Sequence, residues 1–304
     1  MASVRLRTSL LTRNNRLIRG LEFQCNPSKY VKRHISVSSY SGEVFLSTSP
    51  TYGKEVMFLN LNRPKLKNAI SMGLLREFRE CISDAEKNKK LRVLIVCSSI
   101  PGSFCAGADL AERKTMTKAQ VSDFLQDLRN AFTALENLSI PTIAAIDGPA
   151  LGGGLELALA CDFRIAGHSV TKIGLPETRL GIIPGAGGTQ RAARLLGVAK
   201  AKELILTGRI LTASEALSWG LINGISDSRT TAVDKAVQLA QEMLPSAPLA
   251  LKAAKDAIST STSLDLESGL DYERKCYEPL LSTKDRIEAL QAFEEKRTPE
   301  FTGS

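Results

Sequence analysis

The sequence predicts an α/β domain with a largely parallel sheet, followed by a helical region at its carboxyl end. Apolar runs of strand length alternate with segments of helical periodicity up to about residue 189. Beyond that residue the pattern is almost entirely helical, and 220–226 is the only clear strand. The 304 residues are 43% hydrophobic and 24% charged, which is ordinary for a globular protein with a large core.

The elements follow from the chain in order. The segment 56–64 reads as a strand that ends at an Arg-Pro turn. The segment 71–90 is predicted to be a helix, because its apolar residues, Leu74, Leu75, Phe78, Ile82 and Ala85, recur at helical spacing. Further along we expect a buried strand at 91–99, a helix at about 118–138, a strand at 141–148, a helix after the glycines 152–154, and a strand at 162–167.

The amino terminus carries most of the net charge of +8. Residues 1–42 hold eight basic side chains against Glu22 alone, whereas the rest of the chain holds 32 basic and 31 acidic side chains. A Ser-rich, Arg-rich and acid-poor amino terminus is typical of an organellar transit peptide, although a basic arm that stays attached has the same composition. We therefore predict a mitochondrial transit peptide over 1–40, with the mature protein starting near 36–42.

Several function classes are excluded or weakened by what the sequence lacks. The six cysteines include no CxxC pair, and several lie in apolar runs, which is typical of reduced core thiols. The two histidines, His34 and His168, cannot form an HExxH zinc site, and no GxSxG, GxGxxG or P-loop motif occurs. No apolar run reaches the roughly 18 residues that a membrane span needs. We therefore expect no metal, no nucleotide fold and no membrane insertion.

A second basic feature, the run KNKKLR at 87–92, raises the possibility of RNA binding. A short basic run without aromatic neighbours is more often a solvated helix end, where cations complement the helix dipole. We favour that interpretation and expect no nucleic-acid partner.

Carboxylates among apolar residues are what remains for acid–base chemistry. Glu156 follows three glycines, which indicates a turn with unusual backbone angles or a close approach of the backbone to another group. Glu177 lies before a loop rich in glycine and proline. A carboxylate in an apolar pocket has a raised pKa, which suits proton transfer. Glycine-bearing loops near helix starts, FCAGAD and LGGGLE, offer backbone N–H groups for a developing oxyanion. The alternative interpretation is an ordinary glycine-rich turn before a buried helix, with Glu156 pointing to solvent.

The segment IDGPALGGGLELALACD (146–162) resembles the signature of the crotonase, or enoyl-CoA hydratase/isomerase, superfamily. The resemblance extends from about Gly53 to Phe301 and includes LNRPKLKNAI, PGSFCAGADL and GLPETRLGIIPGAGGTQR. It implies a ββα-spiral core at 41–245 and a helical trimerisation region at 246–304, with a homotrimer or homohexamer as the assembly. Within the superfamily the chain is most similar to mitochondrial enoyl-CoA hydratases and methylglutaconyl-CoA hydratases.

The resemblance also implies roles for individual residues. The N–H groups of Ala106 and Gly153 would bind the thioester carbonyl of an acyl-CoA. Glu156 would activate water and Glu177 would handle the proton at Cα. Substrate-binding positions would be Lys65, Leu66, Ala106, Gly107, Ala108, Asp109 and Gly153. Together these imply syn addition of water to a short-chain or branched 2-enoyl-CoA in the mitochondrial matrix, with coenzyme A as part of the substrate and no separate cofactor.

Three questions stay open on the sequence. An enoyl-CoA isomerase is the main alternative activity, but isomerisation needs only one base and the chain has two glutamates. A methylglutaconyl-CoA substrate needs a further cation near the acyl end, and the sequence does not locate one. The segment around His168 and Lys172 is about one residue longer than in most hydratases, so we expect a surface turn there, and this turn is where a displacement of Glu177 would arise.

Overall fold

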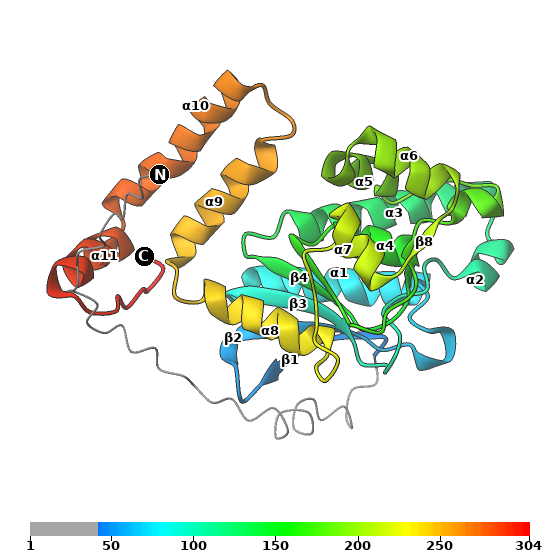
Figure 1. The fold of residues 1–304 in the computed structure, drawn as a ribbon, viewed down its shortest axis with the longest axis horizontal. Coiled ribbons are helices and arrows are strands. Elements are labelled where there is room, and N and C mark those ends of the chain that lie inside the picture. Colours follow the sequence, from blue (N-terminus) through cyan, green and yellow to red (C-terminus); the bar gives the residue numbers. More distant parts are fainter. Residues whose placement is uncertain (1–41) are drawn as a thin grey trace, which may run out of the picture. The chain divides into compact units, whose positions relative to one another are not determined.

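A computed structural model describes residues 42–304, so the predicted transit peptide over 1–40 lies outside the described residues. The central sheet has six strands in the order β1-β2-β3-β4-β6-β9 (Figure 1). β1 runs antiparallel to β2, and the other neighbouring strands are parallel. These strands are β1 Val44–Ser49, β2 Gly53–Leu61, β3 Val93–Ser98, β4 Thr142–Ile146, β6 Phe163–Ala166 and β9 Gly224–Ile225.

The sheet is buried on both faces, which explains why its inner strands read as unbroken apolar runs. Along β3, Leu94 and Val96 belong to one hydrophobic cluster and Ile95 to the other, as the alternation of side chains in a strand requires. Helix α8 (Ala232–Met243) covers one face through small residues such as Ala236. The larger cluster, on the other face, takes in side chains from most of the remaining core helices.

Several helices of the core begin at residues whose side chains cap them. Ser71 accepts a hydrogen bond from the N–H of Leu74, and Thr117 forms a capping box with Gln120. The core helices are α1 Met72–Lys87, α2 Leu110–Thr115, α3 Lys118–Glu136, α4 Gly153–Leu159, α5 Gly188–Leu196, α6 Val198–Leu206, α7 Ala213–Trp219 and α8, with short 3₁₀ turns η2 Pro64–Leu66 and η3 Glu177–Leu180.

A second sheet of three very short strands was not predicted. It comprises β5 (Ala150–Leu151), β7 (Ile173–Gly174) and β8 (Ile210–Leu211), in the order β5-β7-β8. Two-residue strands are too short to show periodicity, so no pattern in the sequence predicts them. Their position matters, because β5 ends directly before the three glycines and β7 lies just before Glu177.

The carboxyl-terminal region is helical, as predicted. It consists of α9 (Pro248–Thr260), α10 (Leu266–Tyr277), η4 (Glu278–Ser282) and α11 (Lys284–Glu295), with α9 and α10 side by side (Figure 1). Lys255 of α9 donates to Asp162 Oδ2 at 2.8 Å and to the carbonyl of Ile140 at 2.9 Å. These two contacts hold α9 to the segments that lead into β4 and β6.

Candidate active site

Glu156 is buried at the start of α4, with 3% of its surface exposed. Its Oε1 accepts hydrogen bonds from the N–H groups of Ala186 and Gly188, both at 2.8 Å. Burial raises the pKa of Glu156, and these two donors, together with the charges of Arg191 and Arg113, oppose the rise. The carboxylate is therefore held in one orientation and does not reach out to solvent.

The three glycines before Glu156 serve both purposes that the sequence suggested. Gly152 has φ +53° and ψ −125°, a conformation that side chains with a Cβ rarely adopt. Gly154 lies so close to the Cys105 carbonyl that any Cβ would overlap it. The turn thus presses the start of α4 against the loop that carries Cys105.

Glu177 is the first residue of η3 and lies against the same glycine turn. A Cβ on Gly152 would be 3.1 Å from Glu177 Oε1, and Glu177 Oε2 is buried without a hydrogen-bond partner among the described residues. Burial, reinforced by the nearby negative charge of Glu156, raises the pKa of Glu177 to about 7. The two glutamates therefore share one site, in which Glu156 Oε1 accepts from two N–H groups and Glu177 Oε2 has no partner among the described residues.

The turn around His168 does not disturb this arrangement. His168 is exposed, and the N–H of Val170 donates to the Gly167 carbonyl at 3.0 Å to close a turn. Lys172 is likewise exposed. The surface turn expected there is present, and Glu177 still reaches Gly152.

The structure contradicts one of the two expected oxyanion donors. The N–H of Ala106 donates to the Lys67 carbonyl at 3.1 Å, so it is not available to a substrate. The N–H of Ala108 lies across from Gly153, where a Cβ on Gly153 would be 3.7 Å from the Ala108 nitrogen. Within the part of the chain that the structure describes, the N–H groups of Ala108 and Gly153 have no acceptor. Ala108 therefore takes the place that we assigned to Ala106.

Gly107 sets the direction of these donors. It has φ +95°, and a Cβ there would lie 2.8 Å from the Leu151 carbonyl. The Gly107 carbonyl accepts from the N–H of Ile70 at 2.8 Å, and the N–H of Asp109 donates back to the Ile70 carbonyl at 3.0 Å. This two-sided pairing leaves the N–H of Ala108 pointing away from Ile70, toward the start of α4.

The side chain of Asp109 is bound within the protein, and its predicted role in substrate binding stays a prediction. Oδ1 accepts from the N–H groups of Ala111 and Glu112, both at 3.1 Å, and caps α2. Oδ2 accepts from Arg63 at 2.7 Å. The Glu112 N–H and then the Arg63 guanidinium hold the pKa of Asp109 below its usual range.

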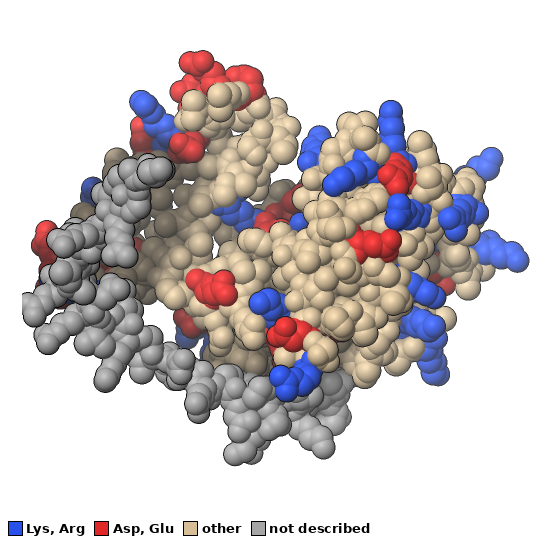
Figure 2. All heavy atoms as spheres, viewed as in Figure 1, with Lys and Arg blue, Asp and Glu red and all other residues tan. Residues whose placement is uncertain are grey.

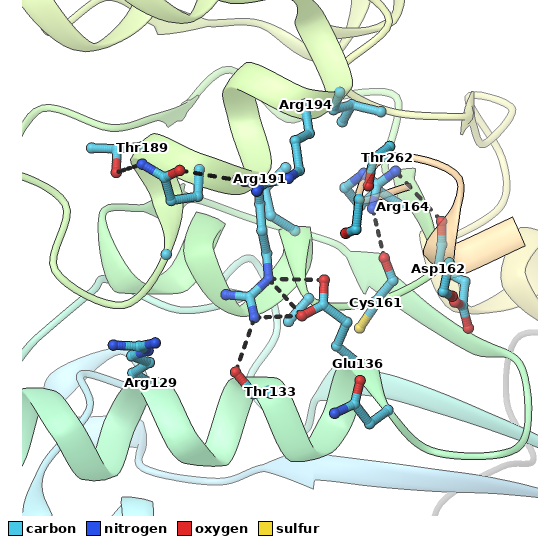
Figure 3. A pocket seen from close by; sticks show the side chains of 18 of the residues that line it. Arg129, Thr133, Glu136, Cys161, Asp162, Arg164, Thr189, Arg191, Arg194 and Thr262 are labelled. Carbon is cyan, nitrogen blue, oxygen red and sulfur yellow. Dashed lines mark hydrogen bonds and ion pairs between the residues drawn. The ribbon is translucent and has the colours of Figure 1, made fainter. Parts of the chain in front are cut away.

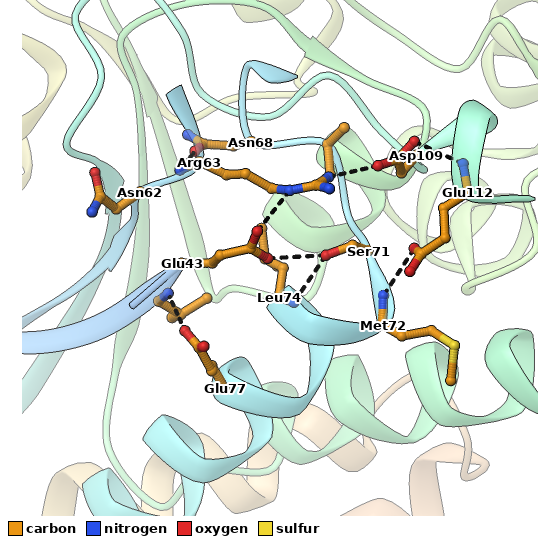
Figure 4. Close-up of polar contacts among 12 residues, drawn as sticks. Glu43, Asn62, Arg63, Asn68, Ser71, Met72, Leu74, Glu77, Asp109 and Glu112 are labelled. Atoms are coloured by element: carbon orange, nitrogen blue, oxygen red, sulfur yellow. Dashed lines mark hydrogen bonds and ion pairs between the residues drawn. The ribbon is translucent and has the colours of Figure 1, made fainter. Parts of the chain in front are cut away.

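Arg63 connects three segments around the loop that carries Ala108 (Figure 4). Besides Asp109, it donates to Glu43 Oε1 and to the Ala69 carbonyl, both at 2.8 Å. Sequence reasoning treated Arg63 only as part of a turn, because its partners lie up to 46 residues away in the chain. Lys65 and Leu66, on the adjacent turn η2, are exposed, and their role in substrate binding stays a prediction.

A hollow of about 870 Å³ is lined by residues of α3, α5 and the segment after α4, and neither Glu156 nor Glu177 is among its lining residues (Figure 3). Its basic side chains include Arg164, which donates to the carbonyls of Leu221 and Cys161. They also include Arg191, which pairs with Glu136 at 2.6 Å and donates to the Ala186 carbonyl at 2.9 Å. Arg191 thereby fixes the loop whose N–H groups hold Glu156. A residue that lines the hollow therefore helps to position a glutamate that does not line it.

Comparison with known proteins places this geometry in a family. The model of the enoyl-CoA hydratase/isomerase family matches residues 51–304. The chain belongs to the enoyl-CoA hydratase/isomerase family. It is 56% identical to enoyl-CoA isomerase/hydratase fer4 of Mycosarcoma maydis, over 82% of this chain and 93% of the relative. It is 47% identical to the mitochondrial methylglutaconyl-CoA hydratase of Mus musculus, over 82% of this chain and 80% of the relative.

The solved structures agree on the fold of this enoyl-CoA hydratase/isomerase family member. The enoyl-CoA hydratase from Bacillus anthracis superposes with a TM-score of 0.81 at 43% identity, covering 86% of this chain and all of that one. The predicted fold class, a crotonase core followed by a helical region, is confirmed. Among the described residues no helix is long and apolar enough to cross a membrane, and no three metal-ligating side chains gather.

Proposed function

We propose that this family member is a hydratase that adds water across the double bond of a short-chain or branched 2-enoyl-CoA, giving a 3-hydroxyacyl-CoA. The observation that carries the proposal is the pairing of two buried glutamates of unlike environment with two N–H groups that have no acceptor. The acyl-CoA is the substrate, and the reaction needs no group beyond the residues described.

The N–H groups of Ala108 and Gly153 receive the thioester carbonyl oxygen. Both donate toward the position where negative charge develops when the double bond is attacked, and Gly153 opens a helix whose dipole favours that charge. A thioester enolate is then stabilised within the site. Removing such a donor typically slows a reaction by about 10²–10³-fold.

The two glutamates divide the proton transfers. Glu156, held by two N–H groups and two guanidinium charges, is the ionised partner that orients water and takes its proton. Glu177, whose pKa is about 7, is the protonated partner that delivers a proton to Cα. The proton taken from water and the proton given to carbon balance, so the pair carries one proton before and after addition.

An isomerase is the competing activity, and one relative is named for both activities. An assay with crotonyl-CoA, followed by loss of the enoyl absorbance, measures hydration, and conversion of 3-hexenoyl-CoA measures isomerisation. We expect hydration to dominate, because shuttling a proton within one substrate uses a single base and leaves Glu156 without a task. Isomerisation without hydration would refute the proposal.

The cellular setting is proposed on the same basis. The basic, acid-poor segment 1–40 has the composition of a mitochondrial transit peptide, and the Mus musculus relative is named as mitochondrial. We therefore assign the protein to the mitochondrial matrix. Within that setting, methylglutaconyl-CoA is the alternative substrate to a straight-chain enoyl-CoA.

The carboxyl-terminal helices support an assembly of three copies, or of two such trimers. In α9 and α10 no residue is buried, yet the region exposes large apolar side chains, namely Ile258, Leu266, Leu270, Tyr277, Leu281, Ile287, Leu290 and Phe293. A surface of this kind is covered by a partner in a stable protein. We take the partner to be another copy of this chain.

An RNA-associated role finds less support. The run 87–92 begins at Lys87, the last residue of α1. Within it Leu91 is buried, and the Arg92 guanidinium donates to the Ser246 carbonyl, so part of the run is bound within the protein. On the face shown in Figure 2, Lys and Arg side chains alternate with acidic and uncharged surface and are most numerous at the end near α2 and α6. A filter-binding titration of the mature protein tests this role, and we expect no RNA binding at physiological salt.

A further inference from the structure

Asn68 is a fully buried polar residue that follows η2 and lies next to Arg63 (Figure 4). Its backbone is left-handed, with φ +57°, and so is that of the preceding Lys67, with φ +49°. Asparagine adopts this conformation more readily than most residues, but left-handed residues other than glycine usually occur singly. The surrounding structure therefore holds this segment in a conformation that is unfavourable for the chain by itself.

The side-chain amide of Asn68 joins three separate segments. Its Oδ1 accepts from the N–H of Arg63 at 2.8 Å. Its Nδ2 donates to Ser98 Oγ and to the Phe104 carbonyl, both at 2.8 Å, and the residues that the structure describes offer that carbonyl no other donor. An amide suits this place, because one group must supply both an acceptor for an N–H and donors for a hydroxyl and a carbonyl.

The same segment also binds the two residues that follow Phe104. We call residues 103–109, which carry the oxyanion donor Ala108, the donor loop. The Asn68 carbonyl accepts from Cys105 Sγ at 3.0 Å, and the Lys67 carbonyl accepts from the N–H next along the donor loop at 3.1 Å. Three successive residues of the donor loop are thus bound to this segment, and the last of them lies two residues before Ala108.

Cys105 is the point at which the donor loop contacts the glycine turn before α4. Its N–H donates to the Pro149 carbonyl at 3.0 Å, and its carbonyl accepts from the N–H of Leu151 at 3.2 Å. The same carbonyl lies where a Cβ on Gly154 would have to be, so the donor loop and the turn are in direct contact. A rotation of the peptide before Cys105 would therefore move the donor loop relative to Gly153, the second oxyanion donor.

We propose that Asn68 is a positioning residue for the oxyanion donors. Its amide fixes the donor loop so that the N–H groups of Ala108 and Gly153 converge on one oxygen. The proposal rests on the proposed hydratase function, because that oxygen belongs to the thioester substrate. Since Asn68 is fully buried, it acts through the Phe104 peptide and not by contact with the substrate.

Asn68→Gly tests the proposal, because glycine adopts a positive φ without steric cost and the variant loses only the side chain. The Phe104 carbonyl then lacks its donor, and the peptide that follows it is free to turn. A displacement of about 1 Å in an active site can slow a reaction about 10²-fold. We expect the kcat for hydration of crotonyl-CoA to fall by about that factor, with a smaller change in KM.

Infrared difference spectroscopy measures the donors without any hydration. Butyryl-CoA labelled with ¹³C at the carbonyl has no double bond to hydrate, and its carbonyl stretching frequency falls when N–H groups donate to the oxygen. We expect the wild-type protein to lower this frequency and Asn68→Gly to return it toward that of free butyryl-CoA. A residue that serves only the stability of the fold would not change the frequency in the folded protein.

Asn60→Gly is the matched control. Asn60 is also fully buried, and its Nδ2 donates to Ser47 Oγ at 2.8 Å and to the Phe58 carbonyl at 3.0 Å. It lies on β2, and none of its partners belongs to the donor loop. We expect this variant to be less stable but to keep the wild-type frequency and kcat. If a glycine variant does not fold by circular dichroism, Asn68→Ala and Asn60→Ala give the same comparison.

Two results overturn the proposal. One is a folded Asn68 variant with the wild-type frequency, and the other is an equal change of frequency in the Asn60 variant, which would indicate a general loosening of the core. A change confined to the Asn68 variants supports the proposal even if crotonyl-CoA is not hydrated, so its outcome is separate from that of the proposed function.

Discussion

At the scale of single residues, the site works through a contrast between two glutamates. Both are buried, but Glu156 receives two backbone N–H groups, whereas Glu177 Oε2 has no partner among the described residues. Burial raises both pKa values, and the negative charge of Glu156 raises that of Glu177 further. The two carboxyl groups therefore differ in their surroundings, and the proposed roles assign the proton to Glu177.

This contrast predicts that the rates of two reactions change with pH in opposite directions. Hydration needs the pair to hold one proton, so kcat/KM should fall as pH rises through about 7, where Glu177 loses it. Exchange of the Cα protons of butyryl-CoA needs ionised Glu177 as the base, so its rate should rise over the same range. Absorbance assays measure the first reaction, and proton NMR in D₂O measures the second.

The two Gln variants serve as controls for that prediction. Glu177→Gln should reduce hydration and exchange by about 10²–10⁴-fold, mainly in kcat. Glu156→Gln should reduce hydration but leave exchange, and it should move the exchange profile to lower pH because the charge that raises the pKa of Glu177 is gone. Near-normal hydration by Glu177→Gln would overturn the assignment.

At the scale of elements, the donors depend on how two loops meet. The loop before α2 and the glycine turn before α4 approach closely because Gly107 and Gly154 have no Cβ. Arg63 and Asp109 then hold the first loop to the segment after β2. The choice of Ala108 over Ala106 as donor follows from this pairing, since Ile70 takes the groups on either side of Ala108.

A backbone ester tests that choice directly. Lactic acid in place of Ala108 changes one N–H to an ester oxygen and leaves the methyl side chain. We expect kcat to fall about 10²–10³-fold, the usual effect of losing an oxyanion donor. The same replacement at Ala106 removes only the bond to the Lys67 carbonyl, so it should alter stability more than kcat. A larger loss of kcat at Ala106 than at Ala108 would restore the original assignment.

The sequence predicted the elements that have clear periodicity and the two glutamates that lie in a recognisable motif. The helix at 71–90 and the strand at 91–99 appear as α1 and β3, and both glutamates lie in one site. It led us to Ala106 and not to Ala108 as the donor, because the direction of an N–H depends on a pairing with Ile70 across the loop, which the sequence does not show. Arg63 was missed for a similar reason, since its partners are brought together only by the fold.

At the scale of the whole molecule, the core and the carboxyl-terminal helices are stabilised in different ways. The sheet packs between two hydrophobic clusters, whereas α11 buries only Asp285 and Ala292 within the chain. Asp285 is held by the N–H groups of Thr302 and Gly303, so the end of the chain folds back on α11. Polar contacts therefore order this region and leave its apolar side chains outward.

That outward surface gives the last prediction. Phe293 is 83% exposed on α11, and burying an aromatic ring contributes about 1.5–3 kcal/mol, so its loss should weaken an assembly of three copies strongly. We expect the mature protein to sediment as a trimer or hexamer and Phe293→Asp to dissociate at micromolar concentration. Gln291→Asp adds the same charge to an exposed site of α11 without removing apolar surface, and it should stay assembled. Circular dichroism establishes that both variants keep their helices. A wild-type monomer, or an assembly that Phe293→Asp leaves intact, would show that these helices are not the interface.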